Sequence, residues 1–65
     1  MKSYSSRDVI AELTADGWYK VNVEGSHHQF KHSTKKGKVT VKHPTKDMNI
    51  KTLKSIERQS GLKFN

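Results

Sequence analysis

Cysteine is absent from this 65-residue sequence, and proline occurs only once. Without cysteine, neither a disulfide nor a thiolate metal site can stabilise the fold. No apolar run approaches the roughly 20 residues of a membrane helix, and none has the pattern of a signal peptide. The length allows one domain, so we expect a single domain over residues 1–65 that is soluble and cytoplasmic.

Acidic side chains are also scarce, since 13 Lys and Arg residues stand against 6 Asp and Glu residues, giving a net charge of +7. The imbalance is uneven along the chain. Residues 1–19 hold two basic and three acidic side chains, whereas residues 20–65 hold eleven basic and three acidic ones. Such a field attracts phosphate backbones and acidic proteins, and it is also compatible with a merely well-solvated surface. Nucleic acid is the partner that we favour.

Two segments have the pattern of amphipathic helices. Ser5 followed by Asp8 fits an N-terminal capping box, which predicts a helix over residues 6–16. Asn49 is the expected N-cap of a second helix over residues 49–60. The apolar stripes comprise Val9, Ile10 and Leu13 in the first helix and Ile50, Leu53 and Ile56 in the second.

Between these helices, three short segments with strand patterning are separated by turn residues. In the first segment, alternation places Tyr19, Val21 and Val23 on one face of a half-buried strand. Short turns join the segments, which predicts an antiparallel meander. The strands are expected over residues 18–23, 28–32 and 38–42.

The predicted order of elements is therefore α-β-β-β-α, an α+β fold. A three-stranded antiparallel sheet is most economically covered by both helices on one face, with the other face open to solvent. This is the layout of double-stranded-RNA-binding domains (dsRBD-like), although a fold alone does not determine a function.

The alternation also separates the histidines. If Phe30 points to the core, His28 shares its side, whereas His27 has the opposite parity. A one-residue slip near Gly25 would exchange the two histidines, so parity favours His27 without deciding between them. The predicted open face of the sheet carries His27, Gln29, Lys31, Lys38, Thr40 and Lys42.

An imidazole beside several ammonium groups suits the cleavage of RNA without a metal. The reaction needs a base for the 2′-hydroxyl, an acid for the leaving 5′-oxygen, and positive charge at the phosphate. Histidine, with an ordinary pKa of about 6.5, can act as either acid or base near neutral pH. Lysines stabilise the developing charge, and Ser26 offers a hydroxyl donor.

The sequence also allows other interpretations. A surface histidine is usually not catalytic, and the fold and charge would equally suit a non-catalytic RNA-binding module. Metal binding is disfavoured because strand geometry turns His27 and His28 to opposite faces and no acidic partner is apparent. We therefore expect no metal and no cofactor.

Several stretches resemble the HicA-type toxin family, also described as YcfA-like, along nearly the whole chain. They include Asp16-Gly17-Trp18, Gly25-Ser26-His27 followed by Phe30, Val39-Thr40-Val41 with His43-Pro44, Thr52-Leu53-Lys54-Ser55-Ile56 and Arg58-Gln59-Ser60-Gly61-Leu62. The order and spacing of these stretches are more specific than Gly-Ser-His alone.

The resemblance implies a dsRBD-like fold and an endoribonuclease (mRNA interferase) that cleaves mRNA in a bacterial or archaeal cytoplasm and blocks translation. It implies a HicB-type antitoxin that masks the active site, and it transfers the catalytic role to His27. Ser26 and His28 stay open as supporting residues. The lysines expected to bind RNA are Lys31, Lys36, Lys38 and Lys42.

Overall fold

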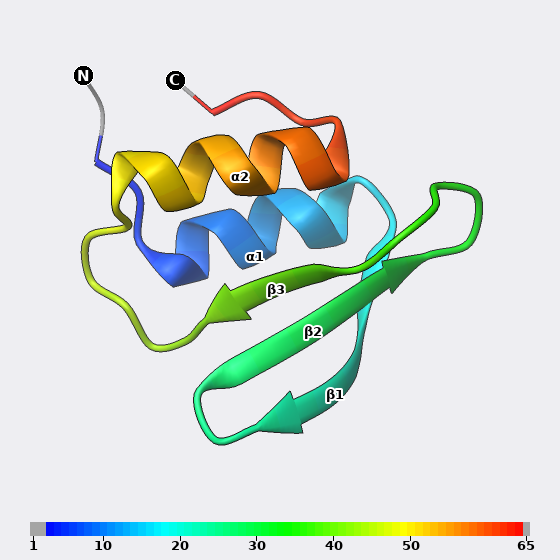
Figure 1. Ribbon diagram of the computed structural model, residues 1–65, viewed down its shortest axis with the longest axis horizontal. Helices are drawn as coiled ribbons and strands as arrows, with labels where there is room; N and C mark the ends of the chain where they lie inside the picture. Colours follow the sequence, from blue (N-terminus) through cyan, green and yellow to red (C-terminus); the bar gives the residue numbers. More distant parts are fainter. Residues whose placement is uncertain (1–2, 65) are drawn as a thin grey trace.

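The computed structural model describes residues 3–64 and has the predicted order of elements, α-β-β-β-α (Figure 1). The elements are α1 (Ser6–Ala15), β1 (Trp18–Glu24), β2 (His27–His32), β3 (Val39–Lys42) and α2 (Ile50–Ser60). Each predicted helix or strand is therefore present, with bounds that differ by one residue. Neither helix in the described range has the length and apolar character needed to span a membrane.

Helix α1 begins where the sequence signal places it. The Ser5 side chain accepts the backbone N–H of Asp8, and the Asp8 carboxylate in turn accepts the backbone N–H of Ser5. This reciprocal capping box satisfies two donors that a helix start leaves without intrahelical partners. Val9 and Leu13 are fully buried, so the predicted apolar stripe faces the core.

Helix α2 has its own local signals. The Asn49 side chain accepts the backbone N–H of Lys51, and Gly61 ends the helix in the left-handed conformation with φ of 78°. Leu53 and Ile56 are buried, as predicted. Ile50 is 46% exposed, so its assignment to the buried stripe is wrong. It is the first residue of α2, while Met48, two residues earlier, is buried in the core.

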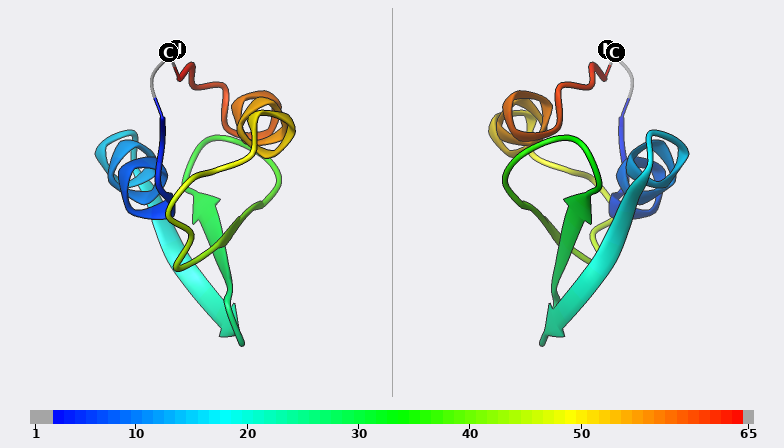
Figure 2. Two further views of the ribbon diagram at one scale, coloured as in Figure 1. Left: turned by 90° about the vertical axis from the view of Figure 1, so that its left-hand side faces the viewer. Right: turned by 90° about the vertical axis from the view of Figure 1, so that its right-hand side faces the viewer.

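The sheet has the order β1-β2-β3 and both pairings are antiparallel. Both helices lie on one side of it, while the far end of the β1–β2 hairpin extends beyond them (Figures 1 and 2). Burial of apolar surface between the helices and the sheet supplies the main stabilising term. The core contains Tyr4, Val9, Leu13, Trp18, Phe30, Val39, Val41, Met48, Leu53 and Ile56.

The predicted burial of the first strand is wrong. Trp18 is 2% exposed and is the buried residue of β1, whereas Tyr19, Val21 and Val23 are 51%, 46% and 44% exposed. Since Trp18 points to the core, its neighbour Tyr19 must point to the open face. A bulge between Lys20 and Asn22 then shifts the alternation, which therefore does not keep the three apolar residues on one face.

Candidate active site

The two-residue link Gly25-Ser26 sets the geometry of the site. Gly25 has φ of 59°, whereas Ser26 has no positive φ, and this combination is typical of a type II′ hairpin turn. The turn pairs Glu24 directly with His27 across the two strands. A side chain at Gly25 would meet no atom within 4 Å, so the space beside the turn is open.

His27 lies on the open face, as the parity argument predicts. Its cross-strand partner in β3 is Lys42, and Gln29 pairs with Thr40 on the same face. His28 instead pairs with Val41, which is fully buried, so His28 points to the side that the helices occupy. The slip that would have exchanged the two histidines is absent from the β2–β3 register.

The lysines expected to bind RNA lie at different distances along the chain from the strands of the open face. Lys42 is directly opposite His27, and Lys38 donates a hydrogen bond to Gln29, with 3.4 Å between Nζ and Oε1. Lys31 pairs across the strands with Tyr19, which brings an exposed aromatic ring to the same face. Lys36 lies in the turn between β2 and β3, outside the strands.

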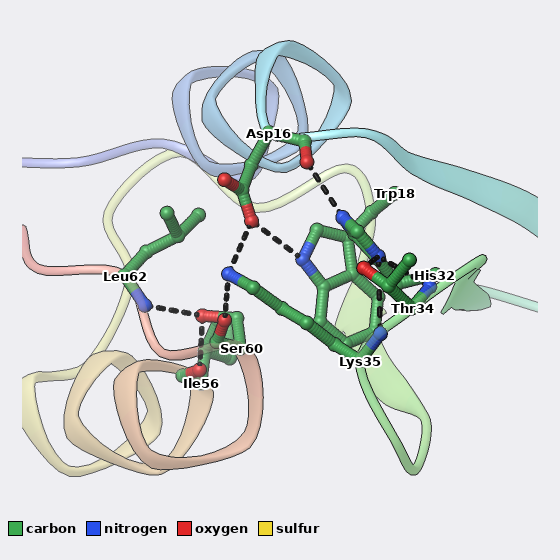
Figure 3. A network of polar contacts seen from close by, with 8 residues as sticks. All are labelled: Asp16, Trp18, His32, Thr34, Lys35, Ile56, Ser60 and Leu62. Carbon is green, nitrogen blue, oxygen red and sulfur yellow. Dashed lines mark hydrogen bonds and ion pairs between the residues drawn. The ribbon is translucent and has the colours of Figure 1, made fainter.

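A neighbouring lysine has a structural role instead. The ammonium of Lys35 contacts a carboxylate oxygen of Asp16 at 2.6 Å and donates to the backbone oxygen of Ser60 at 3.0 Å (Figure 3). The hydrogen bond from Lys35 is the main cause that lowers the pKa of Asp16 below its usual value. Lys35 therefore ties the β2–β3 turn to the ends of both helices.

His32 belongs to the same network, and both of its ring nitrogens have hydrogen-bond partners there. Its Nε2 donates to the backbone oxygen of Asp16 at 2.7 Å, and its Nδ1 accepts the backbone N–H of Thr34 at 3.1 Å (Figure 3). The ring also packs edge-on against Trp18, with 5.3 Å between centroids. A Cβ at Gly17 would lie 2.9 Å from the His32 ring, so this close approach requires glycine.

His28 and Ser26, the two candidates for a supporting role, lie in different surroundings. The ring of His28 meets that of His43 edge-on, with 5.1 Å between centroids. Partial burial lowers the pKa of His28, and the nearby charges of His43 and Lys20 lower it further. The backbone oxygen of Ser26 accepts the N–H of His43 at 2.8 Å. His28 lines a cleft of about 490 Å³ with Ile10, Thr14, Trp18, Tyr19, Lys20, Phe30 and His43.

The comparison with protein families decides the family. The model described as "HicA toxin of bacterial toxin-antitoxin" matches residues 6–62, which span every helix and strand. The chain belongs to the HicA toxin family. No curated protein sequence matches it. This HicA-family chain is the toxin of a toxin–antitoxin system, and its partner is an antitoxin.

Two features of this HicA toxin were not anticipated from its sequence. Glu24 stands beside His27, a position that could have been found by counting back across a two-residue hairpin turn. The second feature is Ser6, to which the sequence pattern gives no role. Its side chain is 1% exposed and contacts His43. Within residues 3–64, no group of three or more His, Asp or Glu side chains is arranged to hold a metal ion.

Proposed function

We propose that this HicA toxin is a metal-independent endoribonuclease that cleaves mRNA and thereby blocks translation. The observation that supports this most is the placement of His27 on the open face, directly opposite Lys42. An imidazole can exchange a proton with the reacting RNA, while an ammonium beside it stabilises the negative charge that develops on the phosphate. These two groups need no cofactor for that chemistry.

Positive charge around His27 would hold the RNA backbone. Lys31, Lys38 and Lys42 would bind phosphates on the open face, with Lys36 extending the same surface into the β2–β3 turn. The open space beside Gly25 would let a phosphate approach the turn, where Ser26 offers a hydroxyl. His28 is on the opposite side of the sheet, so we assign the role of catalytic histidine to His27 and not to His28.

The partner antitoxin would act on the same face. A chain with a net charge of +7 attracts an acidic partner, and a partner that covers His27 would block RNA access. We propose a HicB-type antitoxin in this masking role. Since mRNA is the substrate, toxin and antitoxin would meet in the cytoplasm.

A non-catalytic RNA-binding module is the second candidate function, and one observation favours it. Tyr19 is 51% exposed and shares the open face with Lys31. An exposed aromatic ring beside ammonium groups is suited to stacking an unpaired base, with or without cleavage.

Incubating the purified protein with a long mRNA, with and without EDTA, separates these functions. We expect fragments in both samples from the wild type and none from His27→Ala. Retained circular dichroism would show that the variant is folded. Binding without fragments would favour the RNA-binding module, and cleavage that EDTA abolishes would contradict the metal-independent mechanism.

A further inference from the structure

Glu24 and His27 form the closing pair of the β1–β2 hairpin. Only Gly25 and Ser26 separate them, so the turn holds the two side chains on the same face of the sheet. Directly paired residues of antiparallel strands have Cβ atoms about 4.5–5.5 Å apart. Lys42 is the next residue across the sheet from His27. A carboxylate, an imidazole and an ammonium therefore follow one another across the three strands.

Among the described residues, Glu24 is the only acidic residue in any strand. Three other acidic side chains have structural partners. Asp8 caps α1, Asp16 binds Lys35, and Glu57 accepts the backbone N–H of Phe64. Within residues 3–64, neither the Glu24 carboxylate nor the His27 imidazole makes a hydrogen bond or an ion pair, so both are available to a substrate.

An acidic residue at this position has a cost for RNA binding. A carboxylate repels phosphate, and removing it should tighten binding if it has no chemical task. Lys42 and the other lysines of the open face offset this repulsion. An ionised carboxylate can accept a proton at neutral pH, which is the function that the ammonium groups beside it cannot supply.

We propose that Glu24 is the general base of the cleavage reaction and that His27 is its general acid. Glu24 would take the proton of the 2′-hydroxyl as the 2′-oxygen forms a bond to phosphorus. The bond from phosphorus to the 5′-oxygen breaks, and the imidazolium of His27 gives that oxygen its proton. The products are a 2′,3′-cyclic phosphate and a 5′-hydroxyl. This assignment rests on the proposed ribonuclease function.

The first test compares Glu24→Gln with Glu12→Gln, which removes the same charge from an exposed position on α1. General-base catalysis contributes about 10²–10⁴-fold, so we expect kcat of Glu24→Gln to fall by at least about 100-fold. KM should stay equal or decrease, because a repulsive charge has been removed. The acidic limb of the pH–rate profile should disappear in Glu24→Gln alone, and Glu12→Gln should cut at the wild-type rate.

The second test assigns the two roles with an RNA whose 5′-bridging oxygen at one linkage is replaced by sulfur. A thiolate leaves without needing a proton, so His27→Ala should regain cleavage on this substrate and Glu24→Gln should not. The role of Glu24 would be overturned if Glu24→Gln kept the wild-type kcat and an intact acidic limb. It would also be overturned if Glu24→Gln regained cleavage on the sulfur-substituted RNA. Failure of the wild type to cleave any RNA would instead overturn the ribonuclease function and this inference with it.

Discussion

The hydroxyl of Ser6 lies 2.7 Å from Nδ1 of His43 and links the first turn of α1 to the loop after β3. The same oxygen accepts the backbone N–H of Thr45 at 2.8 Å, so the Ser6 hydroxyl contacts the loop after β3 at two points. Ser6 is 1% exposed, so its hydrogen bonds are sheltered from water.

Loss of this hydroxyl should destabilise the fold. Ser6→Ala leaves the N–H of Thr45 and Nδ1 of His43 without their partner, which should lower the free energy of unfolding by about 1–3 kcal/mol. Urea denaturation measures the change. Ser33→Ala, at an exposed turn position, is the control and should stay within about 0.5 kcal/mol of the wild type. Equal midpoints for the two variants would show that the Ser6 contacts contribute little.

The lowered pKa of His28 predicts a pH-dependent stability. The unfolded chain takes up the proton near the ordinary value of 6.5, before the folded chain does. Stability should therefore decline as the pH falls below about 6.5 and level off once the folded pKa has been passed. His28→Gln should show a smaller decline in its urea midpoints between pH 7 and 5.

A second variant addresses the cause of that shift. Lys20→Gln removes one of the charges that lower the pKa of His28, so the His28 ring should titrate at a higher pH by NMR. Burial is the largest cause, so the pKa should stay below the ordinary value. A titration at or above the ordinary value in the wild type would contradict this environment for His28.

The turn before His27 should matter to cleavage more than to folding. Gly25→Ala places a side chain at φ of 59°, where an L-residue costs about 1–2 kcal/mol. Gly61→Ala makes the same change at φ of 78° at the end of α2, where the added Cβ would lie at an ordinary contact distance of 3.6 Å from Nζ of Lys35. We expect similar losses of stability and a fall in RNA cleavage for Gly25→Ala only. Equal activities would show that the hairpin turn does not position the reacting groups.

Phosphate binding by the open face predicts a change in salt dependence. A plot of the logarithm of the RNA association constant against the logarithm of the salt concentration has a slope of about −0.7 for each phosphate contact with a single strand. Lys31→Ala and Lys42→Ala should each make this slope less steep by about 0.7. The His27→Ala background prevents cleavage during the measurement. Lys54→Ala, an exposed lysine on α2, is the control. An unchanged slope for Lys42→Ala would place the RNA elsewhere.

Local signals in the sequence predicted most of the fold. The capping box of Ser5 and Asp8, the N-cap Asn49 and the alternation around Phe30 each depend on neighbours in the chain, and the structure confirms all three. The parity that sends His27 and His28 to opposite faces follows from the same local geometry. Membership of the HicA family, which the resemblance suggested, is likewise confirmed.

The features that sequence reasoning missed depend on tertiary structure. Val21 and Val23 alternate as a buried strand would, but a bulge interrupts β1 and its far end extends beyond the helices. The contact between Ser6 and His43 joins residues 37 positions apart, which no local pattern reveals. Glu24 was missed because the sequence pattern ended the first strand at Val23 and assigned Glu24 to the turn, whereas it is the last residue of β1 and pairs with His27.

The initial rate of RNA cleavage by His27→Ala and His28→Ala, each in the presence of EDTA, tests the central claim most directly. The two residues are adjacent in sequence and lie on opposite faces of one strand, so each variant controls for the other. We predict that His27→Ala loses at least about 100-fold in rate, as expected for an acid–base residue, while His28→Ala retains most of the wild-type rate. Wild-type cleavage by His27→Ala, or an equal loss in both variants, would contradict the assignment of catalysis to His27 on the open face.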